Sequence, residues 1–234
     1  MDPVVWQIVD SALPTGGFAH SFGLEAAWSL GYLHAVDGAT NAGDLDTCIP
    51  LFTFIDAQLE SLAASELPFV FCSHQMPLKW QEFENQHRVR LYLNPSAYRA
   101  SKSQGQAFLR CALAGLLDDS TNLEPIRIAI QNKKADGLFA PIFGVVCRGL
   151  DIGVNVAQKM YLFLALRDMI SAAKRLALIG PMAGVKLQKS LALRVEEYSL
   201  QYSNKNISQV KQVYPLGDII HSCHEGLFRK LFIS

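Results

Sequence analysis

Apolar residues recur at helical spacing along almost the whole chain, and no other feature constrains its fold as strongly. Strand signals are scarce: few runs alternate, and the Asp37-Gly38 and Asp136-Gly137 pairs are not flanked by two alternating runs. The 234 residues hold no internal repeat, low-complexity tract or linker. We therefore predict an all-α, single-domain helical bundle over residues 1–234.

Proline and glycine breaks divide this bundle into its expected helices. Pro3 suits a first helical turn, and Ser96 can cap the helix that follows Asn94-Pro95. Helices are expected over residues 3–9, from about 21, and over 51–64, 68–73, 77–93, 96–117, 153–177 and 182–202, with a loop over 35–44. The helix over 153–177 is apolar nearly all round, which is typical of a central helix. Arg167 and Asp168 lie in its middle and need partners or an interface if they are buried.

The charge balance excludes several classes of function. Lys plus Arg and Asp plus Glu both number 21, so the zero net charge gives no electrostatic reason to expect nucleic-acid binding. A neutral, apolar-rich chain favours a partner or an oligomer.

No uncharged window reaches the length of a membrane span, and no secretory signal opens the chain. Five cysteines without paired spacing predict reduced thiols in a cytosol.

The segment LPTGGFAHSF, residues 13–22, resembles a phosphate loop only superficially, because no lysine follows its glycines before Lys79. A dinucleotide fingerprint and a nucleophile elbow are also missing. A turn whose glycines supply positive φ, with Phe18 and His20 exposed beside it, is typical of a docking tip. If Gly17 occupies such an exposed position, a Gly17→Val change should disturb docking more than folding. A hydrolase site around His20 and Ser21 stays open as an alternative.

The segment HSCHE near the end of the chain is a weak metal-site candidate. On a helix, His221, His224 and Glu225 would share a face, with Cys223 between them. These donors suit zinc or nickel, but two imidazoles and one carboxylate need a further ligand. Two neighbouring histidines more often cap a helix or face solvent. We therefore predict no resident metal, with His221, Cys223 and His224 as the candidates.

A basic stripe follows the helix after Asn94, where no acidic residue opposes it between His87 and Leu117. It is either a solvated face or a contact for an acidic partner. Its members are Arg99, Lys102 and Arg110, with Arg88 and Arg90 upstream.

Five segments of the chain, in order, resemble the UreF family of urease accessory proteins. The first, DSALPTGGFAHSFGLEAA, looks like the family's N-terminal signature, and the last, HEGLFRKLFIS, looks like its terminus. Between them, LNPSAYRASKSQGQAFLR, LFAPIFGVVCRGLDI and YLFLALRDMISAAKRLALIGPMAGVKLQ are similar to the family's internal motifs. Two departures stand out: Leu138 replaces a frequent histidine, and Gly226-Leu227 replaces an aromatic residue after His-Glu.

The resemblance implies an all-α UreF-like protein of the cytoplasm that is not an enzyme. It would be a homodimeric scaffold that joins a UreD-type protein and the GTPase UreG into the complex that delivers nickel to apo-urease. No cofactor is expected in the chain itself, because the complex handles nickel and the partner binds GTP. A nickel-binding metallochaperone in its own right is the alternative.

The resemblance also suggests where partners bind: a docking segment over residues 1–25 and a tail over 215–234. The partner-binding residues would be Thr15, Gly16, Gly17, Phe18, His20, Ser21, His224, Glu225, Arg229 and Phe232. We assign the dimer interface to Leu166, Arg167, Ile170, Ala173 and Lys174, since an apolar helix with embedded charges suits a seam.

Overall fold

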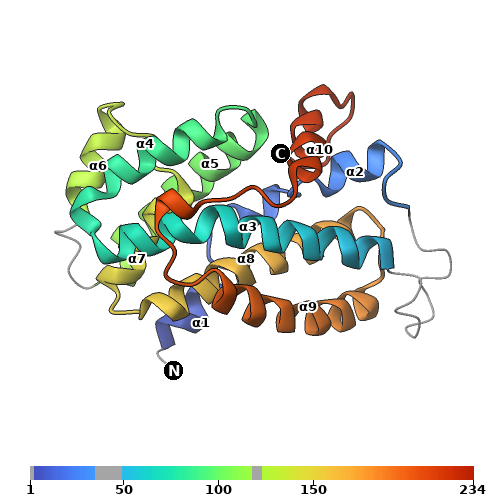
Figure 1. The fold of residues 1–234 in the computed structure, drawn as a ribbon, viewed down its shortest axis with the longest axis horizontal. Coiled ribbons are helices and arrows are strands. Elements are labelled where there is room, and N and C mark those ends of the chain that lie inside the picture. The colour runs from blue at the N-terminus through green and yellow to red at the C-terminus, as the bar shows by residue number, and fades with distance from the viewer. Residues whose placement is uncertain (1–2, 35–48, 118–122) are drawn as a thin grey trace.

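The computed structural model describes residues 3–34, 49–117 and 123–234. These residues form ten α-helices joined by short helical turns and contain no strand, which confirms the all-α prediction (Figure 1). The expected loop over 35–44 lies outside the described residues. Within the described ranges, no helix combines the length and apolar character that crossing a membrane requires.

The helices follow the chain in this order: α1 (Pro3–Val9), α2 (Leu24–Ser29), α3 (Ile49–Gln75), α4 (Trp80–Leu91), α5 (Pro95–Cys111), α6 (Glu124–Gln131), α7 (Phe139–Gly149), α8 (Val154–Arg175), α9 (Pro181–Gln201) and α10 (Pro215–Cys223). Short 3-10 turns occupy Gly17–Ala19 (η1), Pro77–Lys79 (η3), Ile207–Gln209 (η5) and His224–Gly226 (η6), and a π-helical turn (η4) covers Ala112–Leu116.

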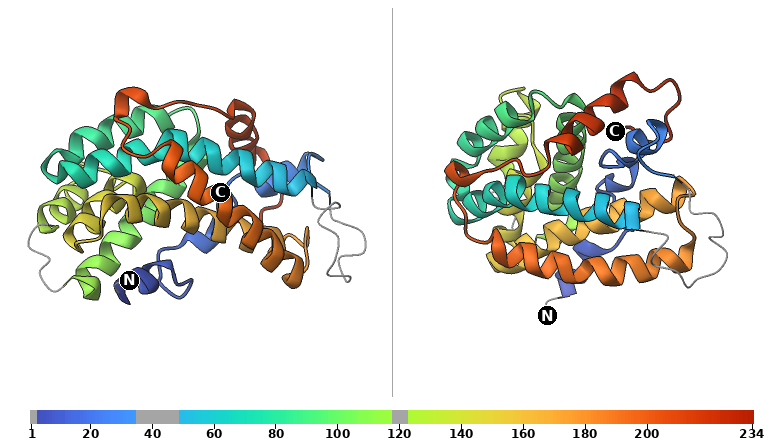
Figure 2. Two further views of the ribbon diagram at one scale, coloured as in Figure 1. Left: turned by 60° about the horizontal axis from the view of Figure 1, so that its bottom comes forward. Right: turned by 45° about the vertical axis from the view of Figure 1, so that its right-hand side comes forward.

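The centre of the fold is α8, packed between other helices as its apolar sequence predicts (Figures 1 and 2). It lies against α3, α7 and α9, and its buried side chains join one continuous hydrophobic core cluster. The helix begins one residue after Gly153 and ends before the Gly180-Pro181 break, close to the predicted limits. The α4–α7 group covers one end of the bundle, and α2 and α10 lie together at the other (Figure 1).

A single helix, α3, replaces the two helices expected over 51–64 and 68–73. Pro68 lies inside it, where proline cannot donate to the carbonyl four residues earlier. That carbonyl belongs to Ala64, and it accepts a hydrogen bond from the backbone N–H of Lys211 at 3.2 Å. The helix therefore continues because another part of the chain satisfies the freed carbonyl.

Two helix starts also differ from the prediction. The cap of α5 is Asn94, whose side chain accepts from the backbone N–H of Ala97 at 3.1 Å, whereas Ser96 donates to Glu225. Because Pro95 occupies the first helical turn, the capping position falls one residue before it. The second helix begins at Leu24 rather than near Ser21, since Ser21 pairs with Ser234 instead of starting a helix.

The two charges in the middle of α8 find partners inside the chain. The Arg167 guanidinium donates to the Asp168 carboxylate at 2.8 and 2.9 Å and to the Val9 carbonyl at 2.9 Å. Burial raises the pKa of Asp168, and the adjacent Arg167 lowers it in part. These contacts fix α1 to α8 and remove one reason for placing an interface there.

Candidate docking site at the terminal junction

Residues from the two ends of the described chain pair directly with each other, and we call residues 15–25 together with 224–234 the terminal junction (Figure 2). The backbone N–H of Ser21 donates to the Ser234 carbonyl at 2.7 Å, and that of Ile233 donates to the Ala19 carbonyl at 2.9 Å. The Ser21 hydroxyl donates to the same Ser234 carbonyl at 3.2 Å. Nδ1 of His20 lies 2.7 Å from the Ser234 hydroxyl.

The carboxylate of Glu25 holds the final residues of the junction in place. It is buried in α2 and accepts the backbone N–H groups of Leu231 and Phe232, the latter at 3.1 Å. Nε2 of His224 donates to it at 2.9 Å. Because hydrogen bonds to a carboxylate are stronger than neutral ones, this one side chain anchors the tail.

Arg175, at the end of α8, joins the two segments through their aromatic rings. Its guanidinium lies 3.8 Å from the Phe18 ring centre and 4.2 Å from that of Phe232, and it donates to the Phe18 carbonyl at 2.6 Å. Each stacked cation–π contact contributes about 0.5–2 kcal/mol. The junction is thus tied to the central helix as well as to itself.

Gly16 and Gly17 have different roles in the η1 turn. Gly16 has φ +78° and faces open space, as expected for a turn glycine. Gly17 is buried and does not have positive φ, and a Cβ there would lie 2.1 Å from Oδ2 of Asp168. The expectation of an exposed Gly17 is therefore wrong, because η1 packs against α8.

This contact reverses the expected effect of Gly17→Val. The added methyl groups would push η1 away from α8 and separate Asp168 from its position beside Arg167. Overpacking of this kind costs about 1–3 kcal/mol. We expect a lower melting temperature for Gly17→Val and little change for Gly16→Ala beyond the strain of its positive φ. A Gly17→Val protein that melts with the wild type and loses only partner binding would contradict this expectation.

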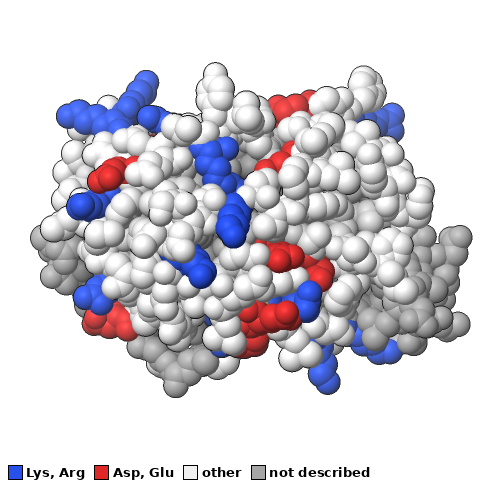
Figure 3. Space-filling model, in the orientation of Figure 1, with Lys and Arg blue, Asp and Glu red and all other residues white. Residues whose placement is uncertain are grey.

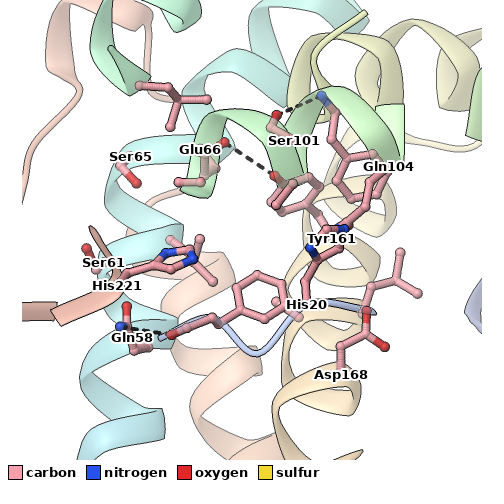
Figure 4. A pocket seen from close by; sticks show the side chains of 18 of the residues that line it. His20, Gln58, Ser61, Ser65, Glu66, Ser101, Gln104, Tyr161, Asp168 and His221 are labelled. Atoms are coloured by element: carbon pink, nitrogen blue, oxygen red, sulfur yellow. Dashed lines mark hydrogen bonds between the residues drawn. The ribbon is translucent and has the colours of Figure 1, made fainter. Parts of the chain in front are cut away.

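Beneath the junction lies a cavity of about 90 Å³ that is lined by both polar and apolar side chains (Figure 4). His221 and Ser65 lie on one side of it, and His20, Tyr161 and Asp168 on the other. Nε2 of His221 and the Ser65 hydroxyl are buried and have no hydrogen-bond partner among the residues that the structure describes. Burial and the nearby His224 lower the pKa of His20 to about 4, and burial with both neighbouring histidines lowers that of His221 to about 3. Both imidazoles are therefore neutral at pH 7.

The metal-site candidates do not come together. His221 and His224 are buried, whereas Cys223 is exposed and Glu225 turns to Ser96 and Arg99 on α5. The expected common helix face is missing because α10 ends at Cys223 and a 3-10 turn follows. No group of three His, Cys, Asp or Glu side chains in the described ranges is arranged to hold a metal ion.

The hydrolase alternative lacks a suitable geometry. The His20 imidazole bonds to the Ser234 hydroxyl, while the Ser21 hydroxyl is directed to a backbone carbonyl. His20, Ser21 and Ser234 are all buried. This arrangement holds two segments together and offers no nucleophile to a substrate.

Acidic residues distant in sequence oppose most of the basic stripe. Lys102 and Arg88 pair with Asp136, Arg99 pairs with Glu225, and Arg90 pairs with the buried Glu66. These four cations are therefore paired within the chain, although the side chains of Arg88, Arg99 and Lys102 remain about half exposed. The sequence does not predict these acidic partners because they lie in other elements of the fold.

The predicted partner-binding residues fall into two groups. Four are exposed, namely Gly16, Phe18, Glu225 and Arg229. Six are buried within the junction: Thr15, Gly17, His20, Ser21, His224 and Phe232. Sequence reasoning missed Glu25 and Ser234, which bind the segments, and the exposed side chains of Phe228, Leu231 and Ile233. The sequence does offer one indication of the role of Glu25, because it is the single charged residue in the apolar segment GLEAAW.

The residues assigned to a dimer interface lie mostly inside this chain. Leu166, Ile170 and Ala173 are buried in its own core, Arg167 is largely covered, and Lys174 is exposed. An interface through the three apolar side chains would require the core to open, because α9 and α3 already cover α8. The apolar character of α8 is explained by its central position.

Comparison with known proteins places these features in a family. The UreF family model matches residues 50–192. Urease accessory protein F of Arabidopsis thaliana is 37% identical over 235 residues, covering 98% of this chain and 91% of that protein. Its namesake in Oryza sativa subsp. indica is 34% identical, with 98% and 84% covered. A UreF-like urease accessory protein of Schizosaccharomyces pombe is 26% identical, with 96% and 94% covered. The chain belongs to the UreF family of urease accessory proteins.

Proposed function

We propose that this protein is a non-enzymatic scaffold that joins a UreD-type protein and the GTPase UreG into the complex that delivers nickel to apo-urease. Family membership supports work in urease maturation, and the sequence motifs of nucleotide binding and nucleophilic catalysis are missing from the chain. In this proposal nickel is handled by the complex, GTP is bound by UreG, and the protein acts in the cytoplasm as a homodimer.

The observation that carries the proposal is an exposed apolar surface on a firmly held junction. Phe18, Phe228, Leu231 and Ile233 project from the terminal junction with exposed fractions of 62, 98, 53 and 64%. Exposed apolar side chains gathered in one region mark interaction sites. The buried hydrogen bonds beneath them order the backbone before a partner arrives, which reduces the entropy cost of binding.

We assign this surface to the UreD-type partner. The exposed members of the predicted set, Gly16, Phe18, Glu225 and Arg229, would contact the partner directly. The buried members would act by holding the surface in shape. Residues 1–25 and 215–234 thus serve one docking site rather than two.

Nickel binding by the chain alone is the weaker candidate, because His221 and Cys223 face different environments. Equilibrium dialysis of the purified chain against nickel tests it. A site weaker than about micromolar would hold little ion against other cellular ligands. Tight binding that is lost in His221→Gln would favour the metallochaperone instead.

Replacing apolar side chains of the junction should weaken partner capture without unfolding the protein. We expect Phe228→Asp and Ile233→Asp each to reduce co-purification of a UreD-type partner about tenfold or more, since burying such a side chain contributes about 1.5–3 kcal/mol. Leu78→Asp is the matched control, because Leu78 in η3 is also 98% exposed but lies outside the junction. Equal capture by all three variants would move the docking site elsewhere.

The proposal as a whole is tested by a pull-down with UreD- and UreG-type proteins, with and without GTP and nickel. A scaffold retains both partners in one complex. A wild-type chain that binds neither, or that alone turns over a substrate, would overturn it.

A further inference from the structure

Two buried polar groups in the cavity beneath the terminal junction have no hydrogen-bond partner among the described residues. They are the Ser65 hydroxyl, from α3, and Nε2 of His221, from α10. Ser65 is 1% exposed and His221 is 8% exposed, and both line the cavity on the same side (Figure 4). Because an unpaired buried polar atom costs free energy, two of them at one cavity point to a molecule that binds there.

The size of the cavity limits what it can hold. Its volume of about 90 Å³ equals the share of about three water molecules, at roughly 30 Å³ each. Pockets for drug-sized ligands and cofactors are roughly three or more times larger, which excludes a nucleotide. The remaining candidates are water and molecules of about four non-hydrogen atoms.

The walls of the cavity favour a small amphipathic molecule over water. Leu62, Leu164 and Ala165 line the cavity together with its polar side chains. A buried water requires two to four polar partners, and apolar walls do not supply them. A molecule with one polar end and an apolar remainder suits both kinds of wall at once.

Charges around the cavity are already paired within the chain. Glu66 binds Arg90 at 2.7 Å, and Asp168 binds Arg167 at 2.8 Å. The third carboxylate of the lining, Asp218, accepts a hydrogen bond from a side-chain amide. A charged ligand would be buried without a free counter-charge, which is costly. The polar end of the ligand is therefore expected to be uncharged.

The two unpartnered groups together need a donor and an acceptor. Burial and the neighbouring histidines lower the pKa of His221 to about 3, so its ring is neutral and carries one N–H and one acceptor nitrogen. The Ser65 hydroxyl both donates and accepts. A carboxamide holds N–H donors and a carbonyl acceptor on one carbon atom, so it can pair with both groups in either tautomer of His221.

We propose that the cavity binds a small uncharged molecule with a carboxamide-like polar end, which bridges Ser65 of α3 and His221 of α10. Helix α10 packs against α2 and α5 and leads directly into residues 224–234 of the terminal junction. The bound molecule would therefore tie the tail to α3 as well. This binding site goes beyond the proposed function, and it is tested on the purified chain without urease partners.

Three planar probes of nearly the same shape separate the ligand classes: acetamide is uncharged, acetate is an anion and acetamidinium is a cation. Acetamide should shift the imidazole nitrogen signals of His221 in the NMR spectrum of the ¹⁵N-histidine-labelled protein and leave those of the exposed His34 unchanged. The ceiling on affinity per atom limits the Kd of such a probe to roughly 40 µM, and we expect about 0.1–10 mM. Tighter binding of acetate or acetamidinium would overturn the assigned class, and no shift at about 100 mM of any probe would overturn the site.

Two serine variants test the contact itself. Ser65→Ala should weaken acetamide binding about three- to tenfold, because one hydrogen bond to the probe is lost. Ser73→Ala is the matched control, since the Ser73 hydroxyl is also buried in α3 without a partner among the described residues but lies outside the cavity lining. Circular dichroism should show both variants folded, because neither change removes a hydrogen bond of the chain. Equal acetamide affinities of the two variants would overturn the proposal.

Hydrogen exchange tests the bridge between α3 and α10. At a probe concentration of ten times Kd, exchange through openings that break the site should slow about tenfold. We expect this protection in α10 and none in α6, which lies at the other end of the bundle (Figure 1). A shift of the His221 signals without protection of α10 would overturn the bridging role.

Discussion

Glu25→Ala should release the last residues of the chain from the N-terminal segment. The change leaves the N–H groups of Leu231 and Phe232 and Nε2 of His224 without their acceptor. An unsatisfied buried donor costs about 1–3 kcal/mol, so the free energy holding the tail should fall by about 3–5 kcal/mol. Hydrogen exchange at Leu231, Phe232 and Ile233 should accelerate at least a hundredfold, and capture of a UreD-type partner should be lost.

Two further variants calibrate this result. Glu25→Gln keeps one carbonyl acceptor and should fall between Ala and wild type. Glu124→Ala removes a half-exposed carboxylate that pairs only with Arg127 among the contacts described, so it should leave hydrogen exchange at residues 231–233 unchanged. Unchanged exchange at residues 231–233 in Glu25→Ala would show that the carboxylate does not anchor the tail.

Acidification should destabilise the protein strongly below the ordinary histidine pKa. The pKa of His20 is about 4 and that of His221 about 3 in the folded chain, against 6.5 for the unfolded group. Burial lowers the pKa of His74 as well. The unfolded state therefore binds more protons, and stability present above pH 6.5 is lost as the pH falls. At pH 4.5, His20 and His221 should each have cost about 2–3 kcal/mol.

Carboxyl groups also contribute to the pH dependence. Burial raises the pKa of Asp168 and Asp218, so protonation of these two groups in the folded state offsets part of the loss on acidification. For Glu66, burial acts to raise the pKa, but His87 and Arg90 lower it to about 2, which adds a loss below pH 4.5. A histidine variant is therefore needed to separate the contribution of the imidazoles from that of the carboxyl groups.

Urea unfolding at a series of pH values measures this dependence. His221→Gln should reduce the slope of unfolding free energy against pH between 6.5 and 4.5, whereas replacing the exposed His34 with Gln should leave it unchanged. A wild-type stability that stays flat over this interval would contradict the burial of neutral imidazoles at the junction.

Local patterns predicted much of the fold because their causes are local. The limits of α1, α8 and α9 follow from Pro3, Gly153 and Gly180-Pro181. The split expected at Pro68 failed because Lys211 satisfies the carbonyl of Ala64 from more than 140 positions away. No local sequence pattern indicates such a contact.

The sequence predicts which segments form the candidate site better than it predicts how they contact each other. Both segments of the terminal junction were singled out, but their pairing through Glu25 and Ser234 joins residues about 200 positions apart. The sequence is compatible with an exposed Gly17 at positive φ, whereas in the structure the close contact with Asp168 leaves no room for a Cβ at this position. Close packing between elements that are distant in sequence cannot be predicted from a single sequence.

The pairing of Ser21 with Ser234, 213 positions apart, has a consequence for biosynthesis. The first half of the junction leaves the ribosome long before the second half is translated. Until residues 224–234 emerge, Glu25 and the ring of Phe18 beside Arg175 lack their cover, so a nascent chain presents surface that chaperones and proteases can engage. The surface can therefore be completed only after residues 224–234 have been translated.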